Sequence, residues 1–156
     1  MSKKLGYRGY IVSRPVRGTS YPHRVQNLVV RDYAARYKLP YKLSATEYAM
    51  SGCYMMLADA LDELPSLEGI ILFSLFVLPQ RKSRRLEIYD RVLTEGCQLR
   101  AALEEMILKD KNDIETLEEM LETVFTLPDV PMGGYYSKSG EGVREDAFWQ
   151  TLQQSL

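Results

Sequence analysis

Polar side chains that could bind an anion lie near the ends of the hydrophobic runs of this sequence. Ser13 and Arg14 come directly after Tyr10-Ile11-Val12, and other candidates lie at the ends of later predicted elements. In open α/β sheets, ligands bind beyond the carboxyl ends of the strands. We therefore expect several of these groups to lie together in one site. The candidate ligand-binding residues are Ser13, Arg14, His23, Thr46, Glu47, Ser74, Arg81 and Glu104.

Arg14 has the clearest chemistry among these candidates. A guanidinium beside the free N–H groups of a helix amino terminus favours a phosphate or a carboxylate. Helix amino termini are expected at His23 and at residues 44–47. The sequence therefore predicts that Arg14 faces an anion in a pocket. The side chains expected to line this pocket with it are Ser13, Thr46, Glu47 and Ser74.

Each of the other candidates also has a structural interpretation that stays open. Ser44 and Glu47 match the capping box S-x-x-E of a helix start. Ser74 could bond a neighbouring carbonyl group, and Glu104 could be a solvated strand end. His23 is the only histidine and precedes a predicted helix, so a surface cap competes with acid–base chemistry there.

The elements that must position these side chains alternate between strand and helix. Short β-branched or aromatic runs favour strands, and apolar residues spaced three and four apart favour amphipathic helices. Strands are predicted near residues 10–12, 41–43, 69–76 and 98–103. Helices are predicted over 23–37, from the capping box at 44–47 to Pro65, from a Ser83 cap to Gly96, and from a cap formed by Asn112 and Glu115.

This alternation predicts a three-layer α/β fold. Connections of this length favour right-handed crossovers between parallel strands. We expect a mostly parallel four-stranded sheet, flanked by helices, with strand order 2-1-3-4. Residues 1–127 are assigned to this α/β domain. Residues 128–156 are a tail rich in Pro and Gly with a terminal amphipathic helix, 145–156, expected to pack on the domain or on a partner subunit.

Composition predicts a soluble cytoplasmic domain. Of the 156 residues, 46% are hydrophobic and 26% are charged, which is ordinary for a globular protein. No apolar run approaches the roughly 20 residues needed to span a bilayer, so no membrane partner is expected. Cys53 and Cys97 are the only cysteines, and a reduced pair fits them better than a disulfide.

The charge is strongly asymmetric along the chain, although the net charge is −1. Residues 1–40 carry nine Lys or Arg and a single acid, Asp32, whereas the rest of the chain is acidic. A basic segment can attract phosphate on a small molecule or on nucleic acid. Alternatively, these cations pair with the acidic second half across the fold.

Several chemistries are excluded by missing motifs. The sequence contains no G-x-G-x-x-G, G-x-x-x-x-G-K-[ST], H-E-x-x-H or C-x-x-C. One histidine and two scattered cysteines do not supply the ligands of a structural zinc site, so no metal is expected. With these motifs missing, no cofactor is expected either. A Ser-His-Asp triad would have to use His23, and Ser13 is not in a G-x-S-x-G elbow. Metal-free chemistry by Arg, Ser and Glu stays open, as does binding without catalysis.

Two strings resemble the catalytic domain of serine recombinases, the resolvases and invertases. Gly9-Tyr10-Ile11-Val12-Ser13 is similar to the family's G-Y-x-R-V-S opening, and residues 70–78 are similar to its strand before L-D-R-L. The resemblance implies a parallel-rich, resolvase- or flavodoxin-like sheet, with Ser13 at the position of the nucleophile. Ile11 replaces an arginine, and Phe76-Val77 replace the catalytic Asp-Arg, so the resemblance implies the fold without recombination.

Four longer strings resemble a second family, which occurs sporadically in bacterial carbohydrate-biosynthesis gene clusters. They cover residues 6–14, 25–33, 44–50 and 73–79. Membership would imply a role in surface-polysaccharide or nucleotide-sugar metabolism. On this basis we expect a cytoplasmic protein that binds, and could transform, a phosphorylated or nucleotide-linked sugar.

Two alternatives to this function stay open. One is a non-catalytic, recombinase-like protein that binds nucleic acid or has a regulatory role. The other is an accessory subunit that docks on a biosynthetic enzyme through the Tyr- and Trp-containing C-terminal segment. Beyond the sugar ligand, we expect a homo-oligomer and no specific nucleic-acid partner.

Overall fold

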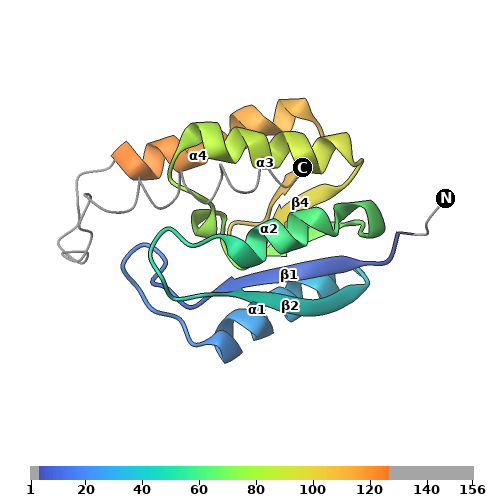
Figure 1. The fold of residues 1–156 in the computed structure, drawn as a ribbon, viewed down its shortest axis with the longest axis horizontal. Helices are drawn as coiled ribbons and strands as arrows, with labels where there is room; N and C mark the ends of the chain where they lie inside the picture. Colours follow the sequence, from blue (N-terminus) through green and yellow to red (C-terminus); the bar gives the residue numbers. More distant parts are fainter. Residues whose placement is uncertain (1–3, 127–156) are drawn as a thin grey trace.

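Five strands form one sheet in the computed structural model, which describes residues 4–126 (Figure 1). The strand order is β2-β1-β3-β4-β5; the first four strands are parallel and β5 is antiparallel to β4. The predicted order 2-1-3-4 is therefore confirmed, and β5 is an additional edge strand. The strands are β1 (Tyr7–Val12), β2 (Tyr41–Glu47), β3 (Gly69–Leu72), β4 (Gln98–Ala101) and β5 (Met106–Leu108).

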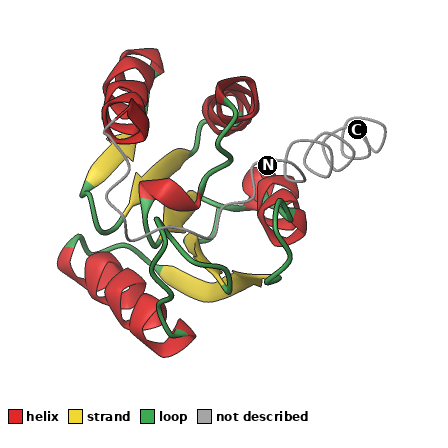
Figure 2. Cartoon of the chain, turned by 90° about the vertical axis from the view of Figure 1, so that its left-hand side faces the viewer, coloured by secondary structure: helices red, strands yellow, loops and turns green. Residues whose placement is uncertain are grey.

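Helices cover both faces of the sheet, which gives the predicted three layers. Within the described residues, α1 lies on one face, while α2, α3 and α4 lie on the other (Figure 2). The helices are α1 (His23–Arg36), α2 (Met55–Asp62), α3 (Lys82–Thr94) and α4 (Lys111–Thr126). Two short 3₁₀ turns, Leu64–Ser66 and Leu75–Val77, precede and follow β3.

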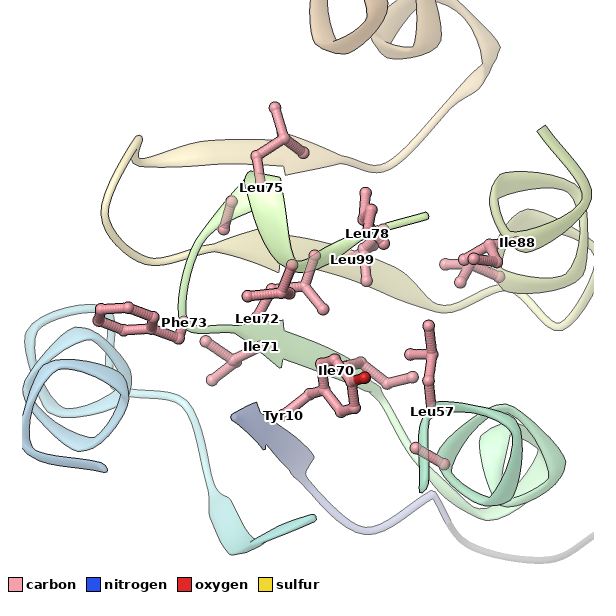
Figure 3. Close-up of a cluster of buried hydrophobic side chains, with 14 of the residues drawn as sticks. Tyr10, Leu57, Ile70, Ile71, Leu72, Phe73, Leu75, Leu78, Ile88 and Leu99 are labelled. Carbon is pink, nitrogen blue, oxygen red and sulfur yellow. The ribbon is translucent and has the colours of Figure 1, made fainter. Parts of the chain in front are cut away.

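The core forms around the two central strands. All four residues of β3 are buried, and only Arg8 of β1 is partly exposed. In Figure 3, Tyr10 and Ile70 point toward the α2 and α3 side, and Ile71 and Phe73 point toward α1. These strands are covered on both faces, which explains why their sequences are unbroken apolar runs.

The predicted helix start at residues 44–47 is wrong. These residues belong to β2, where Thr46 pairs with Ile11 and Glu47 pairs with Val12. Helix α2 begins only at Met55. Backbone pairing with the buried strand β1 outweighs the local capping signal, because it satisfies a whole row of backbone groups rather than one or two.

Other boundaries also shift. Strand β3 ends at Leu72, because the chain turns into the 3₁₀ segment. Helix α3 begins at Lys82 without a side-chain cap, so the predicted Ser83 cap is wrong. Helix α4 is capped by Asp110, whose carboxylate accepts the Asn112 N–H at 2.8 Å, and by Asp113, which accepts the Asp110 N–H. The predicted Asn112 cap is two residues too late.

Two predictions are confirmed in detail, and two lie outside what the structure describes. The helix over 23–37 is present as His23–Arg36. Gly96 follows α3 with a φ of 68°, as expected for a glycine at a helix carboxyl end. The tail 128–156 and its terminal helix lie outside the described residues. No helix in the described part of the chain is long and apolar enough to cross a membrane.

Candidate functional site

The strand order places a switch point between β1 and β3. The chain leaves β1 through α1 to reach β2 on one side, and then crosses through α2 to β3 on the other side. Ligands of open α/β sheets bind at such a point, outside the carboxyl ends of the strands. Residues 13–22, which we name the edge loop, and residues 73–81 occupy this position.

The edge loop is fixed to the sheet by Gln26 and Tyr21. The buried Gln26 side chain accepts the Val12 N–H at 3.0 Å, and its amide group donates to the carbonyl oxygens of Val12 and Tyr21 at 2.8 and 2.9 Å. The Tyr21 ring meets the ring of Phe73 edge-on, with 5.2 Å between centroids. Both ends of the loop are therefore held against β1 and β3.

Ser13 and His23 contact each other across the edge loop. Ser13 Oγ lies 2.8 Å from His23 Nε2 and also donates to the Glu47 carbonyl oxygen at 2.8 Å. His23 is exposed and is the first residue of α1, and Ser13 is partly exposed. In one arrangement, the Ser13 hydroxyl donates to the Glu47 carbonyl oxygen and the Nε2–H group of His23 donates to Ser13 Oγ. In the other, the hydroxyl rotates and donates to an unprotonated Nε2. The pair can therefore donate to or accept from a ligand.

Arg14 is directed into the protein rather than toward an external anion. Its guanidinium donates to the carbonyl oxygens of Cys53 and Val77, each at 3.0 Å, and lies 4.5 Å from the centroid of the Tyr54 ring. Burial alone would lower the pKa of Arg14, but Tyr10, Tyr54 and the nearby Glu47 carboxylate raise it. Arg14 therefore stays charged and joins the loop before α2 to the turn after β3.

Glu47 caps helix α2, which begins at Met55, and not a helix that begins at residues 44–47. Its buried carboxylate accepts the Tyr10 hydroxyl at 2.8 Å and the N–H groups of Met56 and Leu57, each at 3.1 Å. These amides lie in the first turn of α2, where a negative charge is favoured. The capping role that the sequence leaves open is thus present, but for a helix that begins eight residues after Glu47.

Ser74 and Glu104 hold the turn that follows β3. Ser74 Oγ donates to Glu104 at 2.6 Å, and the other carboxylate oxygen accepts the Leu75 N–H at 2.8 Å. Ser74 Oγ also accepts the Phe76 N–H at 3.2 Å. These contacts position the 3₁₀ turn Leu75–Val77 beside the edge loop.

The two remaining candidates are Thr46, which precedes Glu47 in β2, and Arg81, which precedes α3. Thr46 is partly buried within β2, and Arg81 is exposed just before α3. Surface grooves of about 490 Å³ between α3 and α4 and about 430 Å³ near Gly6 and Pro40 include none of the eight candidates. The described residues contain no cluster of His, Cys, Asp or Glu suited to a metal ion. The candidate residues therefore lie outside both of these grooves.

Arg17 is a cation at this edge that sequence reasoning missed. It sits at the tip of the edge loop with a φ of 51°, and its guanidinium carbon lies 5.0 Å from the centroid of the Phe76 ring. Within the described residues, no hydrogen bond or ion pair engages this guanidinium. The available signal was Arg17-Gly18, a turn dipeptide in a loop that follows a buried strand.

Two solved structures share this architecture. One is the N-terminal catalytic domain of TP901-1 integrase, with a TM-score of 0.57 and 13% identity over 76% of this chain and 93% of that one. The other is a resolvase family site-specific recombinase from Streptococcus pneumoniae, with a TM-score of 0.57 and 14% identity over 96% of this chain and 98% of that one. The chain therefore has the fold of resolvase catalytic domains. No family model and no curated protein matches it.

Proposed function

We propose that this protein binds a phosphate-bearing small molecule, a phosphorylated or nucleotide-linked sugar, at the carboxyl edge of its sheet. The observation that carries the proposal is the 2.8 Å contact between Ser13 and His23 at the switch point. An imidazole can donate a hydrogen bond to a phosphate oxygen, and so can the Ser13 hydroxyl when it rotates away from the Glu47 carbonyl oxygen. The pair lies where open α/β sheets bind their ligands.

The amino end of α1 supports an anionic ligand. Pro22 provides no side-chain cap, the first turn contains no acidic residue, and it begins with His23 and Arg24. The free N–H groups of this turn carry partial positive charge that nothing acidic in the turn offsets. An anion at this position would compensate both the helix dipole and the basic side chains.

The sugar part of the proposal rests on the resemblance of four strings to a family of carbohydrate-biosynthesis loci. A cytoplasmic location, expected from the composition, and a homo-oligomeric state are further parts of the proposal. The proposal requires binding only. Catalysis would additionally need His23 to take the Ser13 proton, which the present hydrogen bond to the Glu47 carbonyl opposes.

Thermal unfolding with a ligand panel tests the proposal. The panel contains inorganic phosphate, pyrophosphate, hexose phosphates and nucleotide-linked sugars, with sulfate at equal ionic strength as the control. A ligand at one hundred times its dissociation constant should add about 2.7 kcal/mol of stability. Ser13→Ala and His23→Ala should each weaken the best ligand at least tenfold, whereas Arg31→Ala at an exposed position of α1 should not. A panel without any stabilising member, or variants that bind like the wild type, would refute the proposal.

The second candidate, a non-catalytic nucleic-acid-binding protein, is supported by the resolvase fold and the basic segment 1–40. Binding of labelled duplex DNA at several salt concentrations tests it. If the basic segment acts only by charge, affinity falls steeply with salt and does not depend on sequence. We expect no covalent adduct with supercoiled plasmid, because Phe76 and Val77 replace Asp-Arg and Arg14 is engaged with carbonyl oxygens. A protein-linked nick abolished by Ser13→Ala would favour a recombinase instead.

The third candidate, an accessory subunit, depends on the C-terminal segment. That segment lies outside the described residues, so its contribution stays a prediction. Removing residues 128–156 and repeating the ligand panel would separate the candidates. Ligand binding that survives the truncation would place the site in the α/β domain.

A further inference from the structure

We infer that Arg17 is the phosphate-binding cation of this edge, and that its ligand carries a dianionic phosphate or pyrophosphate group. This inference rests on the proposed function and names the residue that gives it charge selectivity. It also replaces Arg14, for which the sequence predicts that role.

The turn that presents Arg17 is tight and well anchored. Val16 and Thr19 exchange two backbone hydrogen bonds, at 2.8 and 3.1 Å, and Val16 is buried. Arg17 and Gly18 between them have φ values of 51° and 79°, the pattern of a type I′ turn. Glycine, asparagine and aspartate favour the first of these positions. An arginine at this position is contrary to the local backbone preference, so the turn itself does not account for the choice of this side chain.

The ring of Phe76 supports the guanidinium of Arg17. Phe76 is partly buried, and its backbone is held by Ser74, which is itself hydrogen-bonded to Glu104. The Arg17 guanidinium carbon lies 5.0 Å from the ring centroid, within the range of a cation–π contact. Such a contact orders a long side chain without using its N–H donors.

No residue that the structure describes takes up the N–H donors of Arg17, which leaves them available for a ligand. A guanidinium has five donors in a planar fork that matches two phosphate oxygens. Within the described chain no carboxylate or carbonyl oxygen engages them, in contrast to Arg14, whose fork is bound to Cys53 and Val77. Both arginines reach the 3₁₀ turn Leu75–Val77, one through a carbonyl and one through the Phe76 ring. Arg14 therefore has a structural role at this edge, whereas Arg17 is exposed to solvent.

Calorimetric titration of the full chain with inorganic pyrophosphate tests this inference, with phosphate and sulfate for comparison at constant ionic strength. Arg17→Ala should weaken pyrophosphate at least tenfold, and Arg17→Lys should recover only part, because lysine lacks the fork. Arg17→Gly should lose affinity like Arg17→Ala while unfolding at the wild-type temperature or higher, because glycine accepts a positive φ. A loss of pyrophosphate affinity without a loss of thermal stability would identify a ligand-binding role for the Arg17 side chain.

Arg31→Ala is the matched control. Arg31 is an exposed cation of the same basic segment whose guanidinium carbon also lies over a ring, 5.8 Å from the Tyr41 centroid. We expect it to change pyrophosphate affinity less than twofold. Equal losses in Arg17→Ala and Arg31→Ala would overturn the inference in favour of unspecific attraction. Wild-type affinity in Arg17→Ala, with a loss in Ser13→Ala, would overturn it and leave the proposed function intact. A wild-type chain that binds no phosphorylated probe would refute both.

Discussion

The hydroxyl of Tyr10 on β1 donates a 2.8 Å hydrogen bond to the carboxylate of Glu47 at the end of β2. Both side chains are buried, and the same carboxylate accepts two backbone N–H groups from the first turn of α2. One charged group thus joins two strands and a helix directly beneath the candidate site. The free energy of this junction should be measurable by substitution.

Glu47→Ala should lower the free energy of unfolding by at least about 3 kcal/mol, because several buried donors lose their acceptor at ~1–3 kcal/mol each. Tyr10→Phe should cost less, about 1.5–3 kcal/mol for one hydrogen bond to a charged group. Glu47→Gln, which keeps an acceptor oxygen, is the control and should fall between the wild type and Glu47→Ala. Urea denaturation measures all three. A Glu47→Ala protein within about 1 kcal/mol of the wild type would contradict this account.

Arg14→Ala should destabilise the fold rather than selectively weaken an anionic ligand. The substitution leaves the carbonyl oxygens of Cys53 and Val77 without their donors and removes the contact with Tyr54. We expect a loss of roughly 2–3 kcal/mol, as for hydrogen bonds that involve a charged group. Arg14→Lys should recover part of it, since an ammonium can reach one carbonyl oxygen. If Arg14→Ala instead unfolds like the wild type and loses only ligand affinity, the expectation drawn from the sequence is the correct one.

The elements that the sequence predicted correctly are those with a long and uniform signal. Helix α1 has apolar residues at helical spacing, and β1 and β3 are apolar runs that suit strands covered on both faces. Strand β5 has three residues and follows a turn, which is too short for a periodic pattern. The end of β2 was misread because residues 44–47 carry a capping motif whose outcome depends on pairing with β1.

The candidate site was predicted only at the level of its location. The carboxyl ends of β1 and β3 follow from strand order, and Ser13 follows from its place after β1. The direction of Arg14 depends on where residues 53, 54 and 77 lie, which is set by tertiary packing and not by local spacing. Arg17 was missed because its significance comes from Phe76, a residue 59 positions away in the chain.

The buried ion pair between α3 and α4 provides a test of how these helices are joined. Two nitrogens of Arg85 donate to the Glu118 carboxylate, each at 2.9 Å, and the Tyr89 hydroxyl donates to it at 2.8 Å. Removing one partner of such a pair leaves a buried charge and typically costs ~3–5 kcal/mol. Glu118→Leu alone should therefore be severely destabilising.

A double-mutant cycle with Arg85→Met and Glu118→Leu should show a coupling free energy above about 1 kcal/mol. The matched control is the Lys82–Glu122 pair, which joins the same two helices at 3.1 Å with both side chains more than half exposed. Its coupling should stay below about 0.5 kcal/mol, as for other solvent-exposed pairs. Similar coupling in both pairs would show that the buried pair does not hold the helices together.

The ionisation of Tyr10 should lower the free energy of unfolding in alkaline solution. Burial raises the pKa of Tyr10 well above its usual range, and the Glu47 carboxylate raises it further, although Arg14 opposes them. In the unfolded chain the hydroxyl ionises near pH 10. The neutral hydroxyl therefore contributes fully to stability below about pH 10. Its contribution is lost as the pH rises toward the folded pKa, because only the unfolded state can then release the proton.

Comparison of the wild type with Tyr10→Phe isolates this effect from the ionisation of lysines and of other tyrosines. At pH 11, one unit above the unfolded pKa, ionisation of Tyr10 favours the unfolded wild type by about 1.4 kcal/mol. Phenylalanine has no such proton, so the stability difference between the two proteins should shrink by that amount between pH 8 and pH 11. Urea denaturation at both pH values measures it. An unchanged stability difference would mean that Tyr10 ionises in the folded protein as easily as in the unfolded chain. The hydroxyl would then not be shielded from solvent.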